Sequence, residues 1–161
     1  MDKAVNVLNK LLVDIFNDIL TIEQGALQSG KFHDLSVTEV HTIEAIGMYV
    51  SKPMTEVAQT LGVVVGTLTV AINNLVKKGY VERERSEKDR RVVRIKLTRL
   101  GKLAYRIHEK FHSDMIKETI DGLTGDENEV LIRALEKLNI FFTIKYDLVA
   151  GKKKEHVHER G

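Results

Sequence analysis

The sequence predicts a mainly α-helical protein with one small β-hairpin. Three observations support this fold class: apolar residues recur at steps of three and four along most of the chain, two short stretches alternate as strands do, and positive charge is concentrated around those stretches. The chain of 161 residues is 43% hydrophobic and contains no cysteine. These values favour one domain with helical extensions, and they exclude disulfide scaffolds, thiolate metal sites and cysteine nucleophiles.

Hydropathy and charge also indicate where the protein works. No stretch reaches the roughly 18 apolar residues of a membrane span, and the N-terminus lacks the pattern of a secretory signal. We therefore expect a cytoplasmic protein with no membrane partner.

Residues 1–50 carry three Lys/Arg against seven Asp/Glu, whereas residues 77–106 carry twelve against four. A basic block of this kind is typical of a surface that binds a polyanion.

The first predicted element is an amphipathic helix over residues 3–28. Its apolar positions are Val5, Leu8, Leu12, Ile15, Phe16, Ile19 and Ile22. Leu11, Val13 and Leu20 widen this stripe, so we expect the helix to pack against both its own domain and a second subunit. Residues 1–34 are therefore assigned to an N-terminal dimerisation helix.

Two shorter helices are predicted to follow. Ser36 and Glu39 fit a capping box, which starts a helix that runs to about Tyr49. Pro53 stands in the first turn of the next helix, which ends at Gly62.

A fourth helix and a hairpin complete the central part of the chain. The helix covers residues 65–78 and stops at Gly79. Residues 80–85 and 92–97 alternate as strands and are joined by a polar turn. In the second strand, one face carries Val93, Ile95 and Leu97 and the other carries Arg94 and Lys96. Helix, tight turn, helix and two-stranded ribbon is the order of a winged helix–turn–helix, which we assign to residues 35–98.

Two long helices are predicted after the hairpin. Thr98 caps the fifth helix. Its inward-facing residues are expected to be Leu103, Ile107, Phe111, Met115 and Ile120. Thr124 and Glu127 form a second capping box before a sixth helix that runs to about Leu148. Residues 99–148 are assigned to C-terminal dimerisation helices, and residues 149–161 to a disordered charged tail.

The fourth helix carries the pattern that points to function. Its buried side is expected to be Leu68, Ala71, Ile72 and Leu75. The opposite side presents Gly66, Thr67, Thr69, Val70, Asn73, Asn74 and Lys77. These side chains are mostly short or amides, whereas an ordinary surface helix is richer in Glu and Lys. Because an asparagine can bond adenine bidentately and a threonine can touch a thymine methyl group, we expect this side to bind double-stranded DNA.

The hairpin is expected to supply further DNA contacts. The candidate residues are Lys88, Asp89, Arg90, Arg91 and Arg94. Arginine at a hairpin tip suits a narrow minor groove, where the negative potential is concentrated. Asp89 would repel phosphate, so we expect it to pair with Arg91 or a strand arginine and hold the shape of the turn. The glutamates of the first strand leave open that this strand is only a solvated surface.

Residues 61–101, with the sequence LGVVVGTLTVAINNLVKKGYVERERSEKDRRVVRIKLTRLG, resemble the core of the MarR family. The Asp-x-Arg of the wing corresponds to Asp89 and Arg91, and the Leu-Thr-x-x-Gly before the next helix corresponds to residues 97–101. The resemblance covers almost the whole chain except the tail. It implies a homodimeric transcriptional regulator that binds a DNA palindrome, with the first, fifth and sixth helices forming the dimer. Val64 departs from the family pattern, since many members place a polar capping residue there.

Within the family, four stretches are most similar to the fatty-acid biosynthesis repressors of Gram-positive bacteria. They are IFNDIL near residue 15, EVHTIEAIG at 39–47, GTLTVAINNLVKKGY at 66–80 and RSEKDRRVV at 85–93. This similarity implies long-chain acyl-acyl carrier protein as the co-repressor. The acyl chain would need an apolar tunnel, whose expected lining is Ile19, Ile22, Phe32, Ile107 and Phe111. Each of these residues is equally explained as part of the core.

The histidines suggest a second kind of effector. His108 and His112 stand four residues apart on the predicted fifth helix, a spacing that suits two-point chelation of a metal. With Glu23 and His41 they make a set that resembles the zinc-sensing branch of the MarR family. The alternatives are a hydrogen-bonded polar cluster, or a patch that orients the thioester of the acyl carrier. The main prediction requires no cofactor, so zinc (Zn²⁺) is an alternative effector.

Two other classes of function compete with a DNA-binding repressor. An enzyme needs reactive groups set in a pocket, and the sequence has no glycine-rich phosphate loop, no Gly-x-Ser-x-Gly and no recognisable triad, so we expect none. An interaction module whose basic wing binds acidic proteins stays open, because acyl carrier protein is itself acidic.

Overall fold

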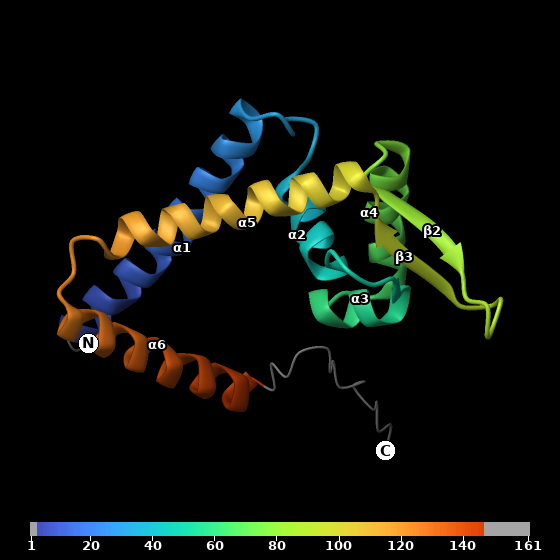
Figure 1. The fold of residues 1–161 in the computed structure, drawn as a ribbon. Coiled ribbons are helices and arrows are strands. Elements are labelled where there is room, and N and C mark those ends of the chain that lie inside the picture. The colour runs from blue at the N-terminus through green and yellow to red at the C-terminus, as the bar shows by residue number, and fades with distance from the viewer. Residues whose placement is uncertain (1–2, 147–161) are drawn as a thin grey trace, which may run out of the picture. The chain divides into compact units, whose positions relative to one another are not determined.

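The computed structural model describes residues 3–146 and confirms the predicted fold class (Figure 1). The elements in chain order are α1 (Lys3–Ser29), α2 (Val37–Ile46), β1 (Lys52–Pro53), α3 (Met54–Leu61), α4 (Val65–Lys77), β2 (Val81–Arg85), β3 (Val93–Leu97), α5 (Arg99–Ile120) and α6 (Gly125–Tyr146). The chain is divided into two compact units, the first ending at Val40 and the second beginning at His41. The predicted tail over residues 149–161 lies outside the described residues.

The first unit holds α1 and the capped start of α2. The predicted capping box is confirmed, because the Ser36 N–H donates to Glu39 Oε2 over 2.9 Å and the Glu39 N–H donates to Ser36 Oγ over 3.2 Å. Much of the predicted apolar stripe of α1 is exposed to solvent. The exposed positions include Val5, Leu8, Leu11, Val13, Ile15, Phe16, Leu20 and Ile22.

The helix–turn–helix of the second unit consists of α3 and α4. The two helices are bent by 106° at their junction, within the range typical of this motif. Gly62, with φ of 65°, ends α3, and Val64 precedes α4 without any side-chain cap, consistent with its departure from the family pattern. The buried residues of α4 are Leu68, Ile72 and Leu75. The predicted inner face of this helix is therefore confirmed at those three positions.

Helix α2 is shorter than the sequence predicted. It ends at Ile46 rather than near Tyr49, because Gly47 adopts a left-handed φ of 77° that stops the helix. Among the described residues, no single helix is long and apolar enough to cross a membrane; only the bent pair α3 and α4 meets that test jointly.

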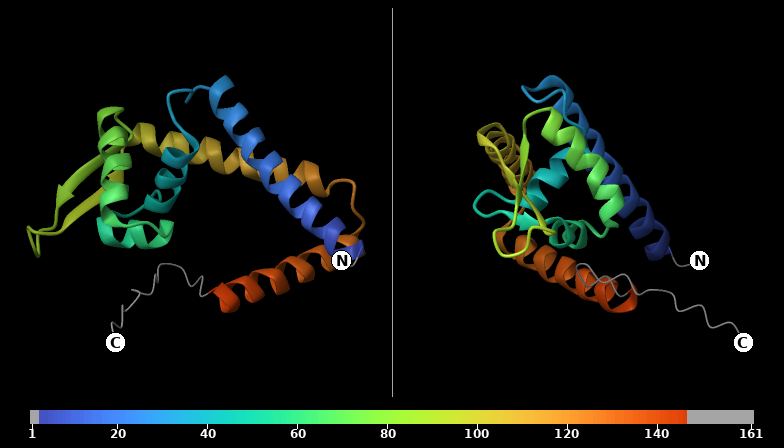
Figure 2. Two further views of the ribbon diagram at one scale, coloured as in Figure 1. Left: turned by 180° about the vertical axis from the view of Figure 1, so that it is seen from behind. Right: turned by 90° about the vertical axis from the view of Figure 1, so that its right-hand side faces the viewer.

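The wing is a three-stranded antiparallel sheet rather than the two-stranded ribbon that was predicted. The strand order is β1-β3-β2, and β1 pairs Lys52 with Ile95 and Pro53 with Arg94. Pro53 therefore lies in an edge strand and precedes α3, instead of standing inside the helix. A strand of two residues leaves no alternation to detect in the sequence. The tip of the β2–β3 hairpin projects past α4 in the left view of Figure 2.

A tight joint connects the wing to α5. Thr98 caps α5 by accepting from the Gly101 N–H over 3.1 Å, as predicted, and its hydroxyl donates to the Gly79 carbonyl over 2.6 Å. The Thr98 N–H donates to the Tyr80 carbonyl over 3.0 Å. The buried Gly101 also lies so close that a Cβ atom there would come within 2.1 Å of the Tyr80 carbonyl oxygen.

The inward side of α5 differs in part from the prediction. The buried residues are Gly101, Ala104 and His108, whereas Leu103 and Ile107 are exposed by 36% and 45%. The small Gly101 and Ala104 bring this side of the helix close to its neighbours, and the prediction is wrong at Leu103 and Ile107. Phe111, Met115 and Ile120 are half-buried. α6 begins with the predicted capping box, in which the Thr124 N–H donates to Glu127 Oε2 over 2.8 Å and the Glu127 N–H donates to Thr124 Oγ1 over 3.3 Å.

Replacing Gly101 with alanine is expected to lower the free energy of unfolding by about 2 kcal/mol or more, because the new methyl group would overlap a backbone oxygen that cannot move independently. Gly66→Ala is the control: it is also helical, its Cβ would meet nothing within 4 Å, and it should stabilise the protein by up to about 1 kcal/mol. Urea denaturation followed by circular dichroism measures both. Equal stability of the two variants would contradict the importance of this close approach.

Candidate nucleic-acid interface

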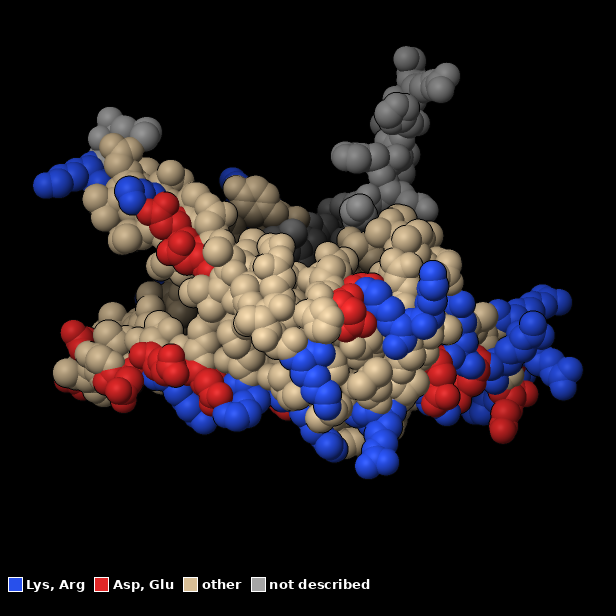
Figure 3. Space-filling model, turned by 90° about the horizontal axis from the view of Figure 1, so that it is seen from above, with Lys and Arg blue, Asp and Glu red and all other residues tan. Residues whose placement is uncertain are grey.

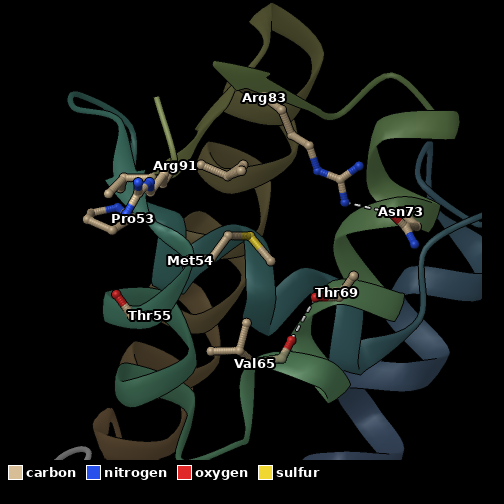
Figure 4. A pocket seen from close by; sticks show the side chains of 10 residues that line it. Pro53, Met54, Thr55, Val65, Thr69, Asn73, Arg83 and Arg91 are labelled. Carbon is tan, nitrogen blue, oxygen red and sulfur yellow. Dashed lines mark hydrogen bonds between the residues drawn. The ribbon is translucent and has the colours of Figure 1, made fainter. Parts of the chain in front are cut away.

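The side of α4 that was predicted to read DNA is accessible. Gly66, Thr67, Val70, Asn73, Asn74 and Lys77 are exposed, and Thr69 is half-buried. Thr69 Oγ1 donates to the Val65 carbonyl over 2.8 Å, and Asn73 Oδ1 accepts from Arg83 Nη2 over 2.5 Å (Figure 4). The bond from Arg83 joins the recognition helix to strand β2, and the sequence did not predict it.

Asp89 holds the turn at the tip of the wing, through the backbone of Arg91. Its Oδ1 accepts from the Arg91 backbone N–H over 2.9 Å, and its carbonyl accepts from the Val92 N–H over 2.9 Å. The expectation that Asp89 shapes the turn is thus supported, with a backbone N–H in place of the guanidinium as donor. Lys88, Arg90 and Arg91 are exposed around it.

Two glutamates of β2 pair with a lysine of β3. Lys96 Nζ lies 3.6 Å from Glu82 Oε1 and 2.9 Å from Glu84 Oε2. Hydrogen bonds from Ser51 and Lys96 lower the pKa of Glu84, and the bond to Glu84 raises the pKa of Lys96. In the space-filling view, cationic and acidic side chains lie intermixed where the wing ends (Figure 3). Glu82 and Glu84 therefore neutralise the positive charge of Lys96 on the neighbouring strand.

Arg94 has a structural role in the wing. Its Nε donates to Ser51 Oγ over 3.0 Å, and its Nη2 donates to the Ser51 carbonyl. The guanidinium thereby ties β3 to the residue that precedes β1. Its contact with DNA stays a prediction.

A groove separates the recognition helix from the wing. Its volume is about 590 Å³, and it is lined by Pro53, Met54, Thr55, Val65, Thr69, Asn73, Arg83, Arg91, Val92 and Val93. Figure 4 shows that the labelled side chains come from the start of α3, from α4 and from the hairpin. Two arginines and a set of apolar side chains thus share one hollow beside the exposed side of α4.

Three histidines of the second unit, His41, His108 and His112, form a compact cluster. His108 Nε2 lies 3.0 Å from His112 Nε2 and 3.3 Å from Glu44 Oε1, and the rings of His41 and His108 are 5.9 Å apart between centroids. Glu44 was missed, although it stands three residues after His41 and so shares its side of a helix. Glu23 is a buried residue of α1 in the other unit, and its place in a metal site stays a prediction.

The residues expected to line an acyl tunnel differ in burial. Phe32 is buried, Ile19 and Phe111 are half-buried, and Ile22 and Ile107 are exposed. They are divided between the two units, and the tunnel stays a prediction.

The fold and this surface define a winged helix–turn–helix protein. A family model described as the MarR family matches residues 33–92. The HTH-type transcriptional regulator SarZ of Staphylococcus haemolyticus is 33% identical over 66% of this chain and 71% of its own length. The crystal structure of Streptococcus pneumoniae FabT in complex with DNA is similar with a TM-score of 0.84 and 41% identity, over 90% of this chain and 99% of that chain.

A more distant neighbour is a mutant of Escherichia coli MarR complexed with operator DNA, with a TM-score of 0.67 and 25% identity over 86% of this chain and 99% of that chain. The chain therefore belongs to the MarR family of transcriptional regulators.

The carboxylate of Asp89 should matter for DNA binding although its charge is unfavourable. Asp89→Ala removes the acceptor for the Arg91 N–H and is expected to weaken duplex binding several-fold, by roughly 1 kcal/mol. Asp89→Asn keeps an acceptor oxygen and removes the charge, so it should bind at least as well as the parent. Anisotropy titrations with one labelled duplex compare them. Tighter binding by the alanine variant would show that charge, and not turn geometry, dominates.

Proposed function

We propose that the chain is a dimeric, sequence-specific repressor of transcription. The observation that carries this proposal is the position of an accessible recognition helix, α4, beside a wing whose basic tip is shaped by Asp89. The likeness to a FabT structure solved with DNA supports it. A regulator that binds chromosomal DNA works in the cytoplasm.

A second copy of this chain is the proposed partner of the exposed apolar surfaces of α1 and α6. Helix α6 contains no buried residue over Gly125–Tyr146. Its exposed apolar residues are Val130, Leu131, Ile132, Leu135, Leu138, Ile140, Phe141, Phe142, Ile144 and Tyr146. Apolar surface of this extent is typical of protein interfaces. A two-fold dimer would set its recognition helices on a palindrome with half-sites about one helical turn, ~34 Å, apart.

The proposed effector is a long-chain acyl group carried on acyl carrier protein, and the proposed targets are genes of fatty-acid biosynthesis. The four sequence stretches that resemble fatty-acid repressors support this assignment, as does the 41% identity to FabT. Ile19, Ile22, Phe32, Ile107 and Phe111 are the residues we propose for the acyl tunnel.

Zinc is the second candidate effector, and the geometry around His108 favours it. One ligand atom each from Glu44, His108 and His112 lie within 4.8 Å of one another. Two ligands about 2.0–2.1 Å from a tetrahedral ion lie about 3.3 Å apart, close to the 3.0 Å and 3.3 Å separations measured from His108 Nε2. A neutral imidazole pair with a carboxylate is a donor set that suits Zn²⁺.

The repressor proposal is tested by fluorescence anisotropy with a labelled palindromic duplex from the region upstream of the gene, in excess chelator. Binding should exceed that of a shuffled duplex and fall steeply with salt, because bound phosphates release counterions. Arg91→Ala should weaken binding to both duplexes and reduce the salt slope by about 1. Long-chain acyl carrier protein should tighten binding, whereas the unacylated carrier should not.

Equal affinity for the palindromic and shuffled duplexes would overturn sequence-specific repression. Specific binding that ignores the acylated carrier would overturn only the proposed effector.

The zinc alternative is tested by calorimetric titration of the metal-free protein with zinc. His112→Gln is expected to weaken zinc binding at least about tenfold, since it removes one of three ligands. His33→Gln is the control, because His33 is an exposed histidine outside the cluster. The same affinity for zinc in the parent and the His112 variant would exclude this cluster as the site.

A further inference from the structure

We infer that Arg83 determines base specificity indirectly, by fixing the side-chain amide of Asn73. This inference rests on the proposed DNA-binding function and concerns how α4 reads one base pair. Arg83 belongs to β2 and Asn73 to the exposed side of α4, and their bond of 2.5 Å spans the groove between helix and wing (Figure 4).

The chemistry of the guanidinium decides which way the amide turns. Arginine has five N–H donors and no acceptor, so the Asn73 atom that faces Arg83 must be the oxygen. A charged donor also makes this a stronger bond than one between neutral groups. The Asn73 NH₂ group is therefore directed away from Arg83, as Figure 4 shows.

The fixed amide changes what Asn73 can recognise. A freely rotating asparagine can bond adenine through both its oxygen and its NH₂ group, as expected from the sequence. With the oxygen held by Arg83, Asn73 presents chiefly a donor. Acceptors in the major groove are the N7 atom of either purine, the O6 atom of guanine and the O4 atom of thymine, whereas cytosine offers only a donor.

The preceding turn of α4 does not duplicate this role. The hydroxyl proton of Thr69 is committed to the Val65 carbonyl, so Thr69 offers an acceptor and a methyl group. Asn73 thus supplies a side-chain donor where Thr69 does not. The resulting specificity is an exclusion: one base position in each half-site accepts adenine, guanine or thymine and rejects cytosine.

The experiment measures base preference position by position. A palindrome selected by the parent from a randomised duplex library is remade with each of the four base pairs at every position of a half-site. Competition titrations then compare the parent with Asn73→Ala, Arg83→Leu, Arg83→Lys and the double variant Asn73→Ala/Arg83→Leu. Arg85→Leu is the matched control, because Arg85 is an exposed arginine two residues further along the same face of β2.

The parent should disfavour cytosine about tenfold at one position, the size typical of one base contact. Asn73→Ala and Arg83→Leu should both reduce that preference below about twofold, and the double variant should show no further change at that position. Arg83→Lys, which keeps a donor-only cation, should restore most of it. Arg85→Leu should weaken binding to every duplex but keep the preference against cytosine, because it removes the same charge and leaves the bond between Arg83 and Asn73 intact.

If Arg83→Leu keeps the parent's preference at the position that Asn73→Ala relaxes, the positioning role is wrong while the repressor proposal stands. The positioning role is also wrong if Asn73→Ala relaxes no position. If the parent itself selects no sequence from the library, the proposed function fails, and this inference fails with it.

Discussion

The close approach of Gly101 to the Tyr80 carbonyl is the constraint on which the rest of the second unit depends. It sets where α5 leaves the sheet, and Thr98 reinforces it with bonds to Gly79 and Tyr80. Because Tyr80 lies between α4 and β2, the same joint fixes the recognition helix relative to the wing.

Four arginines of the wing divide into two groups according to what their surroundings are. Arg94 is held by Ser51, and Arg83 is held by Asn73. Arg90 and Arg91 are exposed at a tip whose geometry depends on a carboxylate. The cationic residues of the hairpin therefore have two roles. Arg83 and Arg94 form bonds that stabilise the structure of the wing, and Arg90 and Arg91 are exposed at its tip.

Local patterns in the sequence predicted most of the fold. Both capping boxes, the cap at Thr98 and the buried residues of α4 depend on neighbours within a few residues, and the structure confirms them. One error was local, because Gly47 ends α2 earlier than predicted; the others arose where tertiary contacts decide. Strand β1 has two residues and exists only because β3 lies beside it, and the inward side of α5 is set by how closely Gly101 can approach.

The same distinction holds for the candidate sites. The exposure of the α4 residues could be predicted from helical periodicity. The bond from Arg83 to Asn73 could not, because it joins residues ten apart on different elements and produces no periodic pattern in the sequence. Glu44 was missed although its spacing from His41 was visible and His41 was already grouped with His108.

The exposed apolar surface of α6 has a thermodynamic consequence. Helix α6 buries no side chain over Gly125–Tyr146 and so gains little from packing; in the dimer proposed above, its order is linked to association. In that dimer, the stability of α6 rises with the concentration of the chain by mass action. A cell that lowers the copy number of this chain would then also lower the fraction of chains in which α6 is ordered.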